Sequence, residues 1–377
     1  MHVAVVSSSL DPWTTPGRPD WCGRAGHLRE VVDTLAAGGH RVDVVVPGRP
    51  GHVVEGSGPV VHRVPVDPAA PDPAAAVRTL TEHLSGLWRD RRPDVVHVHH
   101  WIAALAARQA SADAPVPVVQ TVHGGELESD QDRSAVEHAV LRGADQVVVT
   151  SSADHHAVKG IGVRADRLRI VPLAVDDDEF HPSGPALRRG TRPRLVALGG
   201  ADAEGGADRV VRALATVPDA ELLVAGGLPA GADDPARARL YTLARQHGVG
   251  RRVRFLGPVE RADVPRLIRS ADAVVNAAPR WSTGIAALEA MACGRAVVTA
   301  AVGGNADVVV DQVCGLTVPP RDDRALSRGL REVLSRESSR IAFGAAGRNR
   351  VEVAFRRSHL ARALGEVFER ACLAGTG

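Results

Sequence analysis

Short Val- and Ala-rich runs alternate with amphipathic stretches along most of this 377-residue chain. In the first half, the apolar runs predict strands at Val3–Val6, Arg41–Val46, Val60–Val64, Asp94–His99, Val116–Val122 and Gln146–Thr150. Helical patterns lie between them, at Leu28–Ala37, Ala74–Arg89, Ile102–Gln109 and Arg133–Leu141. Buried β-branched strands that alternate with helices predict right-handed βαβ units and a parallel sheet.

The same alternation starts again after a polar segment rich in Pro and Gly, which begins at His181 and ends at Pro193. The second set of strands is expected at Arg194–Leu198, Glu221–Ala225, Arg252–Leu256, Ala273–Asn276, Ala296–Ala300 and Leu316–Val318. The helices between and after them are expected at Asp208–Ala215, Pro235–Gln246, Ala262–Ser270, Ile285–Ala292 and Asp323–Ser335, with an amphipathic helix at Arg357–Cys372. The chain is therefore predicted to be an α/β protein with two doubly wound, Rossmann-like parallel-sheet domains, residues 1–182 and 193–355, followed by a C-terminal helix in residues 356–377.

Composition narrows the class of protein. With 44% hydrophobic residues the chain can bury two sheets, whereas only 3% aromatic residues and a net charge of +2 argue against nucleic acid as a partner. The four cysteines, Cys22, Cys293, Cys314 and Cys372, show neither metal-ligand spacing nor a disulfide framework. We expect a cytoplasmic protein without a signal peptide or membrane span, because the chain opens on a strand and no apolar run reaches about 18 residues.

The segment from Trp281 to Gly304, WSTGIAALEAMACGRAVVTAAVGG, is the most informative part of the chain. Gly284 and Ile285 mark a loop that enters a helix, Glu289 lies inside that helix, and Gly294 ends it before the next strand. The free N–H groups and positive partial charge of a helix N-terminus suit a phosphate, and a carboxylate can accept hydrogen bonds from a sugar diol. This segment predicts a site for a phosphorylated sugar or a nucleotide.

Other polar or Gly-rich residues follow predicted strands, and ligands of open α/β sheets bind at the carboxyl ends of the strands. His97 and His99 lie on one face of their strand by alternation. Together with His100 they could suggest zinc, but this ion needs further ligands in fixed geometry and the third histidine lies in the turn. The remaining strand-end candidates are Ser7–Ser9, Gly23, His27, Trp101, His123, Gly199, Gly200, Gly226 and Gly227.

The run Leu288-Glu289-Ala-Met-Ala-Cys-Gly294 resembles the nucleotide-sugar signature of retaining glycosyltransferases of family 4, which have the GT-B fold. The resemblance implies two Rossmann-like domains facing a cleft, a C-terminal helix that crosses back onto the first domain, and transfer of a hexose from a nucleoside-diphosphate sugar to a small-molecule acceptor without a metal. It implies that His123 approaches the donor sugar as the catalytic residue and that Glu289 holds the ribose hydroxyls. By the same resemblance the donor site comprises Gly23, Gly199, Gly200, Gly227, Trp281, Gly284, Ile285 and Glu289, and the acceptor or cleft-lining residues are His27, His99 and Trp101.

Three positions that contact the donor sugar and pyrophosphate in the family depart from its pattern. Trp281 replaces its first Glu, and Gly200 and Gly205 replace the Arg and Lys that hold the donor pyrophosphate. One interpretation is an active transferase with an altered donor site, in bacterial secondary metabolism, with Trp281 on the sugar ring and with arginines elsewhere, such as Arg209, Arg212 or Arg280, on the phosphates. The other is a member that has lost catalysis and acts as a binding or partner subunit. A sugar-phosphate epimerase of the same architecture fits less well because it lacks the Glu-Ala-Met-Ala-x-Gly helix. A homodimer is compatible with either.

Overall fold

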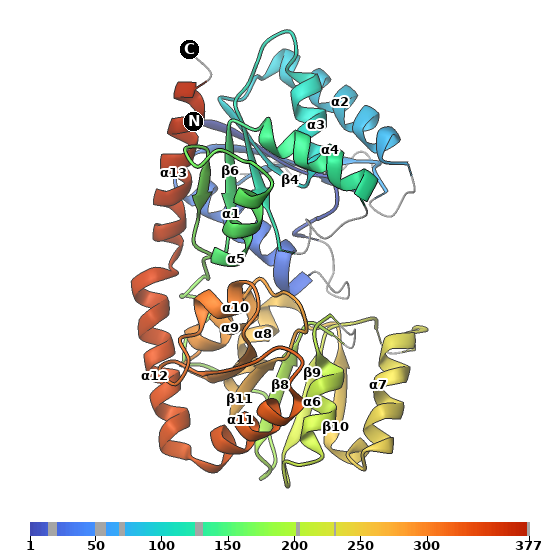
Figure 1. Ribbon diagram of the computed structural model, residues 1–377, viewed down its shortest axis with the longest axis vertical. Helices are drawn as coiled ribbons and strands as arrows, with labels where there is room; N and C mark the ends of the chain where they lie inside the picture. The colour runs from blue at the N-terminus through green and yellow to red at the C-terminus, as the bar shows by residue number, and fades with distance from the viewer. Residues whose placement is uncertain are drawn as a thin grey trace. The chain divides into compact units, whose positions relative to one another are not determined.

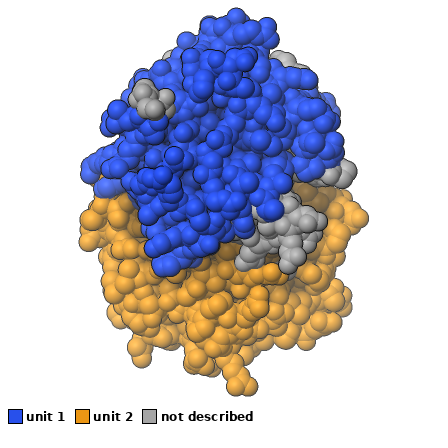
Figure 2. Space-filling view, turned by 45° about the horizontal axis from the view of Figure 1, so that its top comes forward, with its two compact units in different colours: residues 1–13, 28–172, 357–377 blue, residues 14–27, 173–356 orange. Residues whose placement is uncertain are grey.

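The computed structural model describes residues 1–13, 21–49, 58–67, 72–124, 131–200, 204–229 and 231–374. The chain forms two compact units, coloured separately in Figure 2. Unit 1 contains residues 1–13, 28–172 and 357–377, and unit 2 contains residues 14–27 and 173–356. The second segment of unit 1 thus ends at residue 172, and residues 14–27 group with unit 2.

Unit 1 is built on a seven-stranded sheet in the order β3-β2-β1-β4-β5-β6-β7, in which every pairing is parallel. Its central strands carry continuous Val-rich sequence because helices cover the sheet. The strands are β1 (His2–Ser7), β2 (Arg41–Pro47), β3 (Val60–Val64), β4 (Val95–His99), β5 (Val118–Val122), β6 (Gln146–Val149) and β7 (Leu168–Ile170). The helices are α1 (Gly26–Ala37), α2 (Pro73–Asp90), α3 (Trp101–Ala110), α4 (Gln131–Arg142), α5 (Ser152–Gly160) and α13 (Arg357–Ala374) (Figure 1).

Unit 2 repeats this topology with six parallel strands in the order β10-β9-β8-β11-β12-β13. The strands are β8 (Arg194–Leu198), β9 (Glu221–Ala225), β10 (Val253–Gly257), β11 (Ala273–Asn276), β12 (Ala296–Ala300) and β13 (Leu316–Val318). The α-helices are α6 (Ala207–Leu214), α7 (Pro235–Gln246), α8 (Val264–Arg269), α9 (Ile285–Ala292), α10 (Gly304–Val308), α11 (Asp323–Ser335) and α12 (Glu337–Ala354). A π-helical turn, η1 (Trp21–Ala25), and two 3-10 turns, η2 (Gly250–Arg252) and η3 (Arg261–Asp263), complete the elements. The predicted fold class is confirmed, with two parallel-sheet α/β units.

Helix α12 shows why some elements escape the sequence pattern. It was not predicted, because its buried positions are Phe343, Gly344, Gly347 and Val351 rather than a stripe of large apolar residues. A Cβ at Gly344 would lie 2.2 Å from the carbonyl oxygen of Gly294, so the helix approaches α9 closely through glycine. The short elements β7 and α10 and the polar helix α5 were missed as well.

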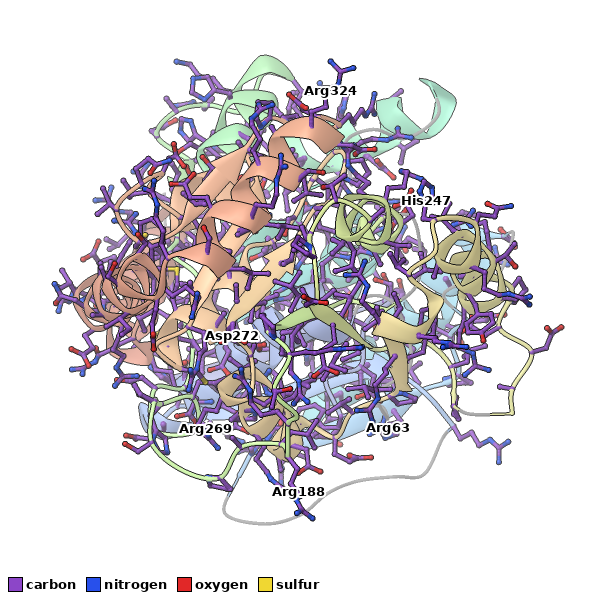
Figure 3. All side chains as sticks on the ribbon, turned by 90° about the horizontal axis from the view of Figure 1, so that it is seen from below. Arg63, Arg188, His247, Arg269, Asp272 and Arg324 are labelled. Carbon is purple, nitrogen blue, oxygen red and sulfur yellow. The ribbon has the colours of Figure 1, made fainter. Side chains whose placement is uncertain are left out.

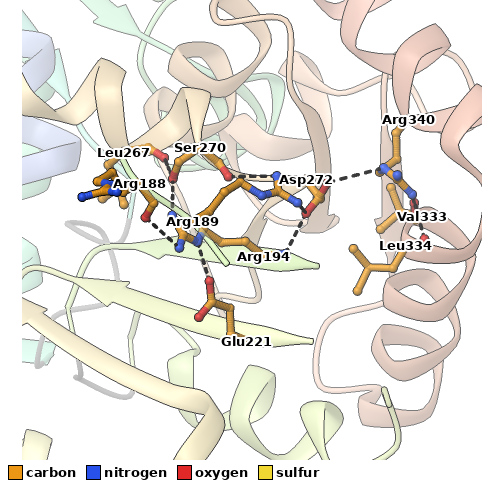
Figure 4. A network of polar contacts seen from close by, with 10 residues as sticks. All are labelled: Arg188, Arg189, Arg194, Glu221, Leu267, Ser270, Asp272, Val333, Leu334 and Arg340. Atoms are coloured by element: carbon orange, nitrogen blue, oxygen red, sulfur yellow. Dashed lines mark hydrogen bonds and ion pairs between the residues drawn. The ribbon is translucent and has the colours of Figure 1, made fainter. Parts of the chain in front are cut away.

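The segment expected as a linker, residues 181–193, is hydrogen-bonded to unit 2. Arg194 is 1% exposed, and its guanidinium donates to Glu221 Oε1 at 2.6 Å and to Ser270 Oγ at 3.1 Å (Figure 4). Asp272, labelled in Figure 3, accepts the Arg194 N–H at 2.7 Å and Arg189 Nη2 at 2.9 Å. These contacts lie at the amino ends of β8 and β11, the edge of the sheet opposite the expected ligand site, so they serve the fold.

The last helix belongs to unit 1. Helix α13 contacts β4, β5 and β6, and its Phe368 ring meets His97 edge-on at 5.6 Å between centroids. Arg357 Nε at its first turn donates to Glu30 Oε2 on α1 at 2.7 Å. The chain therefore returns to unit 1 after completing unit 2. Among the described residues, no helix combines the length and apolar character needed to cross a bilayer.

Candidate functional site

Helix α9 starts from a loop that is packed backbone against backbone. Gly284 precedes the helix with φ of 89°, and a Cβ there would lie 2.9 Å from the carbonyl carbon of Gly304. The Gly304 N–H donates to the Ser282 carbonyl at 2.7 Å. Ile285 is 2% exposed and packs in the core, so its backbone is the part that could meet a ligand. Gly284 is thus required by the fold itself, whatever binds at the helix start.

Glu289 is buried at the second turn of α9, with 1% of its surface exposed. Its Oε1 accepts a hydrogen bond from Arg261 Nη1, and its Oε2 has no hydrogen-bond partner. Burial raises the pKa of this carboxyl, and the charge and hydrogen bond of Arg261 oppose that rise. The Arg261 side chain is itself 30% exposed. Glu289 therefore has one oxygen fixed by Arg261 and a second, buried oxygen that could still accept a hydrogen bond.

The glycine pairs after β8 and β9 also pack against each other. The Gly200 N–H donates to the Ala225 carbonyl at 2.8 Å. A Cβ on Gly200 would lie 3.0 Å from Gly227 N, and one on Gly226 would lie 2.8 Å from Gly200 N. Gly199, Gly200 and Gly227 therefore bring two loops together at the carboxyl edge of the sheet, where they can offer only backbone groups to a ligand.

The two arginines on α6 that were expected as substitutes for the missing phosphate cations are engaged elsewhere. Arg209 Nη2 lies 2.6 Å from Asp323 Oδ1 on α11, and Arg212 donates to Asp323 and to Asp208 at 3.2 and 2.6 Å. Each guanidinium has a carboxylate partner that joins α6 to α11 or closes one helical turn. The expectation that Arg209 or Arg212 serves the donor phosphates is not supported by these contacts.

A different arginine lies beside the signature helix. Turn η1 packs against the loop before α9, where a Cβ on Gly23 would lie 3.3 Å from Thr283 Oγ1. Arg24, the next residue, places its guanidinium 5.6 Å from the centroid of the Trp281 ring. Sequence reasoning missed Arg24, because no spacing rule connects residue 24 with residue 281. Trp281 was expected to stack on the donor sugar. In the structure, the Arg24 guanidinium lies over the Trp281 ring.

In unit 1 the strand ends bring two predicted histidines together. His99 Nδ1 and His123 Nε2 are 3.0 Å apart, and their rings stack with centroids 5.3 Å apart. Each is 1% exposed. His97 shares a face with His99, as alternation predicted, but its Nε2 bonds Thr121 Oγ1 at 2.6 Å. In the described part of the chain, no group of three or more His, Cys, Asp or Glu has an arrangement that could hold a metal ion.

His27 and Trp101, expected to line the acceptor side, are both buried. His27 on α1 is 2% exposed, and burial lowers its pKa from 6.5 to about 4, so its imidazole is neutral at pH 7. Trp101 is 9% exposed and packs in the hydrophobic core of unit 1 with residues of α2, α3 and β4. Both side chains are therefore packing residues, His27 at the start of α1 and Trp101 at the start of α3, shortly after β4.

Comparisons with known proteins agree with this architecture. The family described as Glycosyltransferase Family 4 matches residues 23–179, and Glycosyl transferases group 1 matches residues 183–350. The D-inositol 3-phosphate glycosyltransferase of Xylanimonas cellulosilytica is 30% identical, with 92% of this chain and 91% of that protein covered. The protein of the same name from Mycolicibacterium smegmatis is also 30% identical, with 92% and 86% covered.

Solved structures show the same fold. Sucrose-phosphate synthase from Thermosynechococcus elongatus superposes with a TM-score of 0.87 at 24% identity, covering 100% of both chains. HepE of Anabaena, solved in complex with UDP and glucose, superposes with a TM-score of 0.76 at 18% identity, covering 98% of this chain and 99% of that one. With two parallel α/β units, matches to both family halves and relatives that span nearly its whole length, this chain belongs to the family 4 glycosyltransferases of the GT-B fold.

Proposed function

We propose that this glycosyltransferase takes its sugar from a nucleoside-diphosphate sugar and transfers it, with retention at the anomeric carbon, to a hydroxyl group of a small polar acceptor. The observation that carries the proposal is Glu289. A buried carboxylate with one oxygen fixed by Arg261 and the other unbonded is suited to accept the paired hydroxyls of a ribose. The start of the same helix supplies N–H groups for the adjoining phosphate.

Backbone groups and one arginine would then bind the diphosphate. The loop before α9 and the glycine pairs after β8 and β9 lie at the carboxyl edge of the sheet of unit 2, where backbone groups would meet the diphosphate. Arg24, whose guanidinium lies over the Trp281 ring, brings a positive charge to the loop before α9. A cation aimed at a departing diphosphate stabilises charge that develops in the transition state. Arg24 would thus take over the task of the charged residues that Gly200 and Gly205 replace.

The relatives suggest the first acceptor to test. Relatives that match along nearly the whole chain are named for D-inositol 3-phosphate, so a polyol phosphate is the acceptor class we propose. Acceptors from bacterial secondary metabolism, the class expected from the sequence, form the second panel. His123 is the residue that we propose for catalysis, and its ring contacts His99.

The test is transfer with UDP-, GDP- and dTDP-sugars as donors and inositol phosphates as acceptors. We expect turnover with one donor series, an α-linked product from an α-linked donor by NMR, and full activity in EDTA because no metal takes part. An inverted product would contradict retention, and loss of activity in EDTA would contradict the metal-free mechanism. Absence of nucleoside-diphosphate binding by calorimetry would contradict the proposed donor.

One competing function is a binding subunit without catalysis. Arg209 and Arg212 are paired with aspartates, so fewer cations remain to bind a diphosphate. This observation favours a binding subunit. Such a subunit would bind a nucleoside diphosphate yet show neither transfer nor slow donor hydrolysis. Substituting Arg24→Met separates the two functions: in a transferase, kcat falls about 10- to 100-fold as one charge-assisted contact is lost, and a binding subunit has no turnover to lose.

A further inference from the structure

Arg261 occupies a fixed place between three segments of unit 2. It begins η3, the turn that leads into α8, and its Nη1 donates to Glu289 on α9. Its guanidinium carbon lies 4.4 Å from the centroid of the Phe180 ring, and its Nε is 3.8 Å from Glu179 Oε2. A planar fork that is stacked on one side and paired on two edges has little freedom to rotate.

The pairing at Glu289 uses only half of the carboxylate. A charge buried to 1% exposure must be paired, because an isolated carboxylate in an apolar surrounding is very unfavourable. Arg261 provides this pairing at Oε1. Oε2 has no partner, although leaving a buried acceptor without a hydrogen bond destabilises the fold. A packing role alone would be served better by a carboxylate whose two oxygens are both bonded, so the geometry points to a ligand that donates hydrogen bonds.

We infer that Arg261 is a positioning residue, which holds Glu289 by Oε1 so that Oε2 faces the ribose hydroxyls of a bound nucleoside diphosphate. The inference rests on the proposed function and adds a residue to its donor site. Glu179 and Phe180 support Arg261 from the opposite side, so the segment 179–180, α8 and α9 meet at a single guanidinium. No step of the transfer passes through Arg261.

The experiment measures how much each variant depends on the ribose hydroxyls. The probes are UDP, ADP and GDP, each with its 2′,3′-dideoxy counterpart, and the readout is the ratio of the two Kd values by calorimetry. For wild type we expect a ratio of about 10 to 100, because hydrogen bonds to a charged group contribute about 1.5–3 kcal/mol. In Arg261→Gln the ratio falls to about 1–3. The matched control is Arg266→Gln, an exposed arginine on α8 that pairs with Asp263, and it keeps the wild-type ratio.

Further variants separate a loss of ribose binding from a loss of folding. Arg261→Gln leaves a buried carboxylate unpaired, which destabilises the protein. Arg261→Lys keeps the charge but loses the planar fork, so we expect a folded protein with a ribose ratio severalfold below wild type and a Tm near it. The double variant Arg261→Met with Glu289→Gln removes both charges. It should fold and bind the ribose and dideoxy forms equally.

A pH profile gives a readout that a merely structural role would not change. Without Arg261 nothing opposes the rise that burial causes in the pKa of Glu289, so the carboxyl of Arg261→Gln stays protonated up to a higher pH than in wild type. The affinity of Arg261→Gln for UDP should therefore decrease on acidification at a higher pH than that of wild type, whereas the double variant shows a flat profile. The elements packed against α9 carry further charged or titratable side chains: Arg24 on η1, Arg266 and Arg269 on α8, Asp307 on α10, and Glu337, Arg340, Arg348, Arg350 and Glu352 on α12, with Cys293 at the end of α9. Arg266 changes only in the control and the others are kept in every variant, so they cannot account for a difference between wild type and the Arg261 variants.

The outcomes separate the inference from the proposed function. If wild type prefers the ribose forms and both Arg261 variants keep that preference, Arg261 only supports the fold and the inference is overturned while the donor proposal stands. If wild type binds the ribose and dideoxy forms equally, Glu289 does not hold the ribose and both are overturned. If wild type binds none of the three nucleoside diphosphates, the donor proposal falls and the inference falls with it.

Discussion

The two units share a strand order but differ in what they place at the carboxyl ends of their strands. In unit 1, β4 and β5 end in imidazole and hydroxyl groups, with His99 and His123 in contact at 3.0 Å. In unit 2, β8 and β9 end in glycine pairs, and the polar side chain on the signature helix is the buried Glu289. The same topology therefore carries two kinds of site. One acts through side chains, and the other acts mainly through backbone N–H groups with one carboxylate.

This difference suggests that the two units bind ligands of different kinds. Glycine pairs let two loops approach until their backbones touch, which leaves room for a large, flat ligand such as a nucleotide. A pair of stacked imidazoles offers donors and acceptors without carrying a fixed charge, which suits contact with a neutral sugar. The predictions below test whether the two sites are as distinct as their side chains suggest.

Replacing His123 should have the largest effect, and on catalysis rather than on binding. We expect His123→Ala to lower kcat about 10²- to 10³-fold, because a positioned hydrogen-bonding group in a water-excluded site contributes that much to many transfers. The Kd for the nucleoside diphosphate should stay within about threefold of wild type, since we propose that unit 2 binds the nucleotide. The control is His156→Ala, an exposed histidine on α5. An unchanged kcat would show that unit 1 contributes no catalytic histidine at this position.

Acid should destabilise the protein through His27. Its folded-state pKa of about 4 lies below the value of 6.5 expected when unfolded, so between these values the unfolded chain binds a proton that the folded chain does not. This contribution to the free energy of unfolding is intact above about pH 6.5 and is lost as the pH falls toward 4, by up to about 3 kcal/mol. Urea denaturation of wild type and His27→Gln at pH 7 and pH 5 measures it. Equal pH sensitivity of the two proteins would rule out His27 as the cause.

Glycine substitutions should distinguish a packed site from an open surface. Gly284→Ala should destabilise the protein by about 2 kcal/mol, because φ is 89° and the added Cβ would lie 2.9 Å from the Gly304 carbonyl carbon. Gly365→Ala on α13 has open space around the new Cβ and should stabilise it by about 0.5–1 kcal/mol. Thermal melts compare the two. A neutral Gly284→Ala would mean that the loop before α9 relaxes easily and is not a fixed platform.

The smallest effect concerns the helix that covers only unit 1. Arg357→Met should lower the stability of unit 1 by about 1 kcal/mol, because a partly exposed arginine loses its bond to the buried Glu30. Hydrogen exchange should increase in α13 and in the strands that it contacts, and stay unchanged in α9. Arg362→Met, an exposed position on α13, is the control. Faster exchange spread equally over both units would indicate that α13 supports more than unit 1.

Local sequence patterns were sufficient for much of the fold. Strands β8, β9, β11, β12 and β13 and helices α7, α9 and α11 have the bounds that apolar periodicity predicted. Apolar runs and turn residues act over a few positions, so they can be read from a single chain. Helix α12 could not be predicted in this way, because glycines form part of its buried face. These glycines pack against residues more than forty positions away in the chain.

The sequence by itself determined the two parallel-sheet units, the signature helix with Glu289 and the absence of charge at Gly200 and Gly205. Only the tertiary structure decided which side chains meet: Arg261 with Glu289, Arg24 with Trp281, and Arg209 and Arg212 with aspartates instead of with phosphate. The reason is physical. Secondary structure follows from interactions between near neighbours, whereas the charge balance of a buried site is set by groups that only the folded sheet brings within a few ångströms of one another.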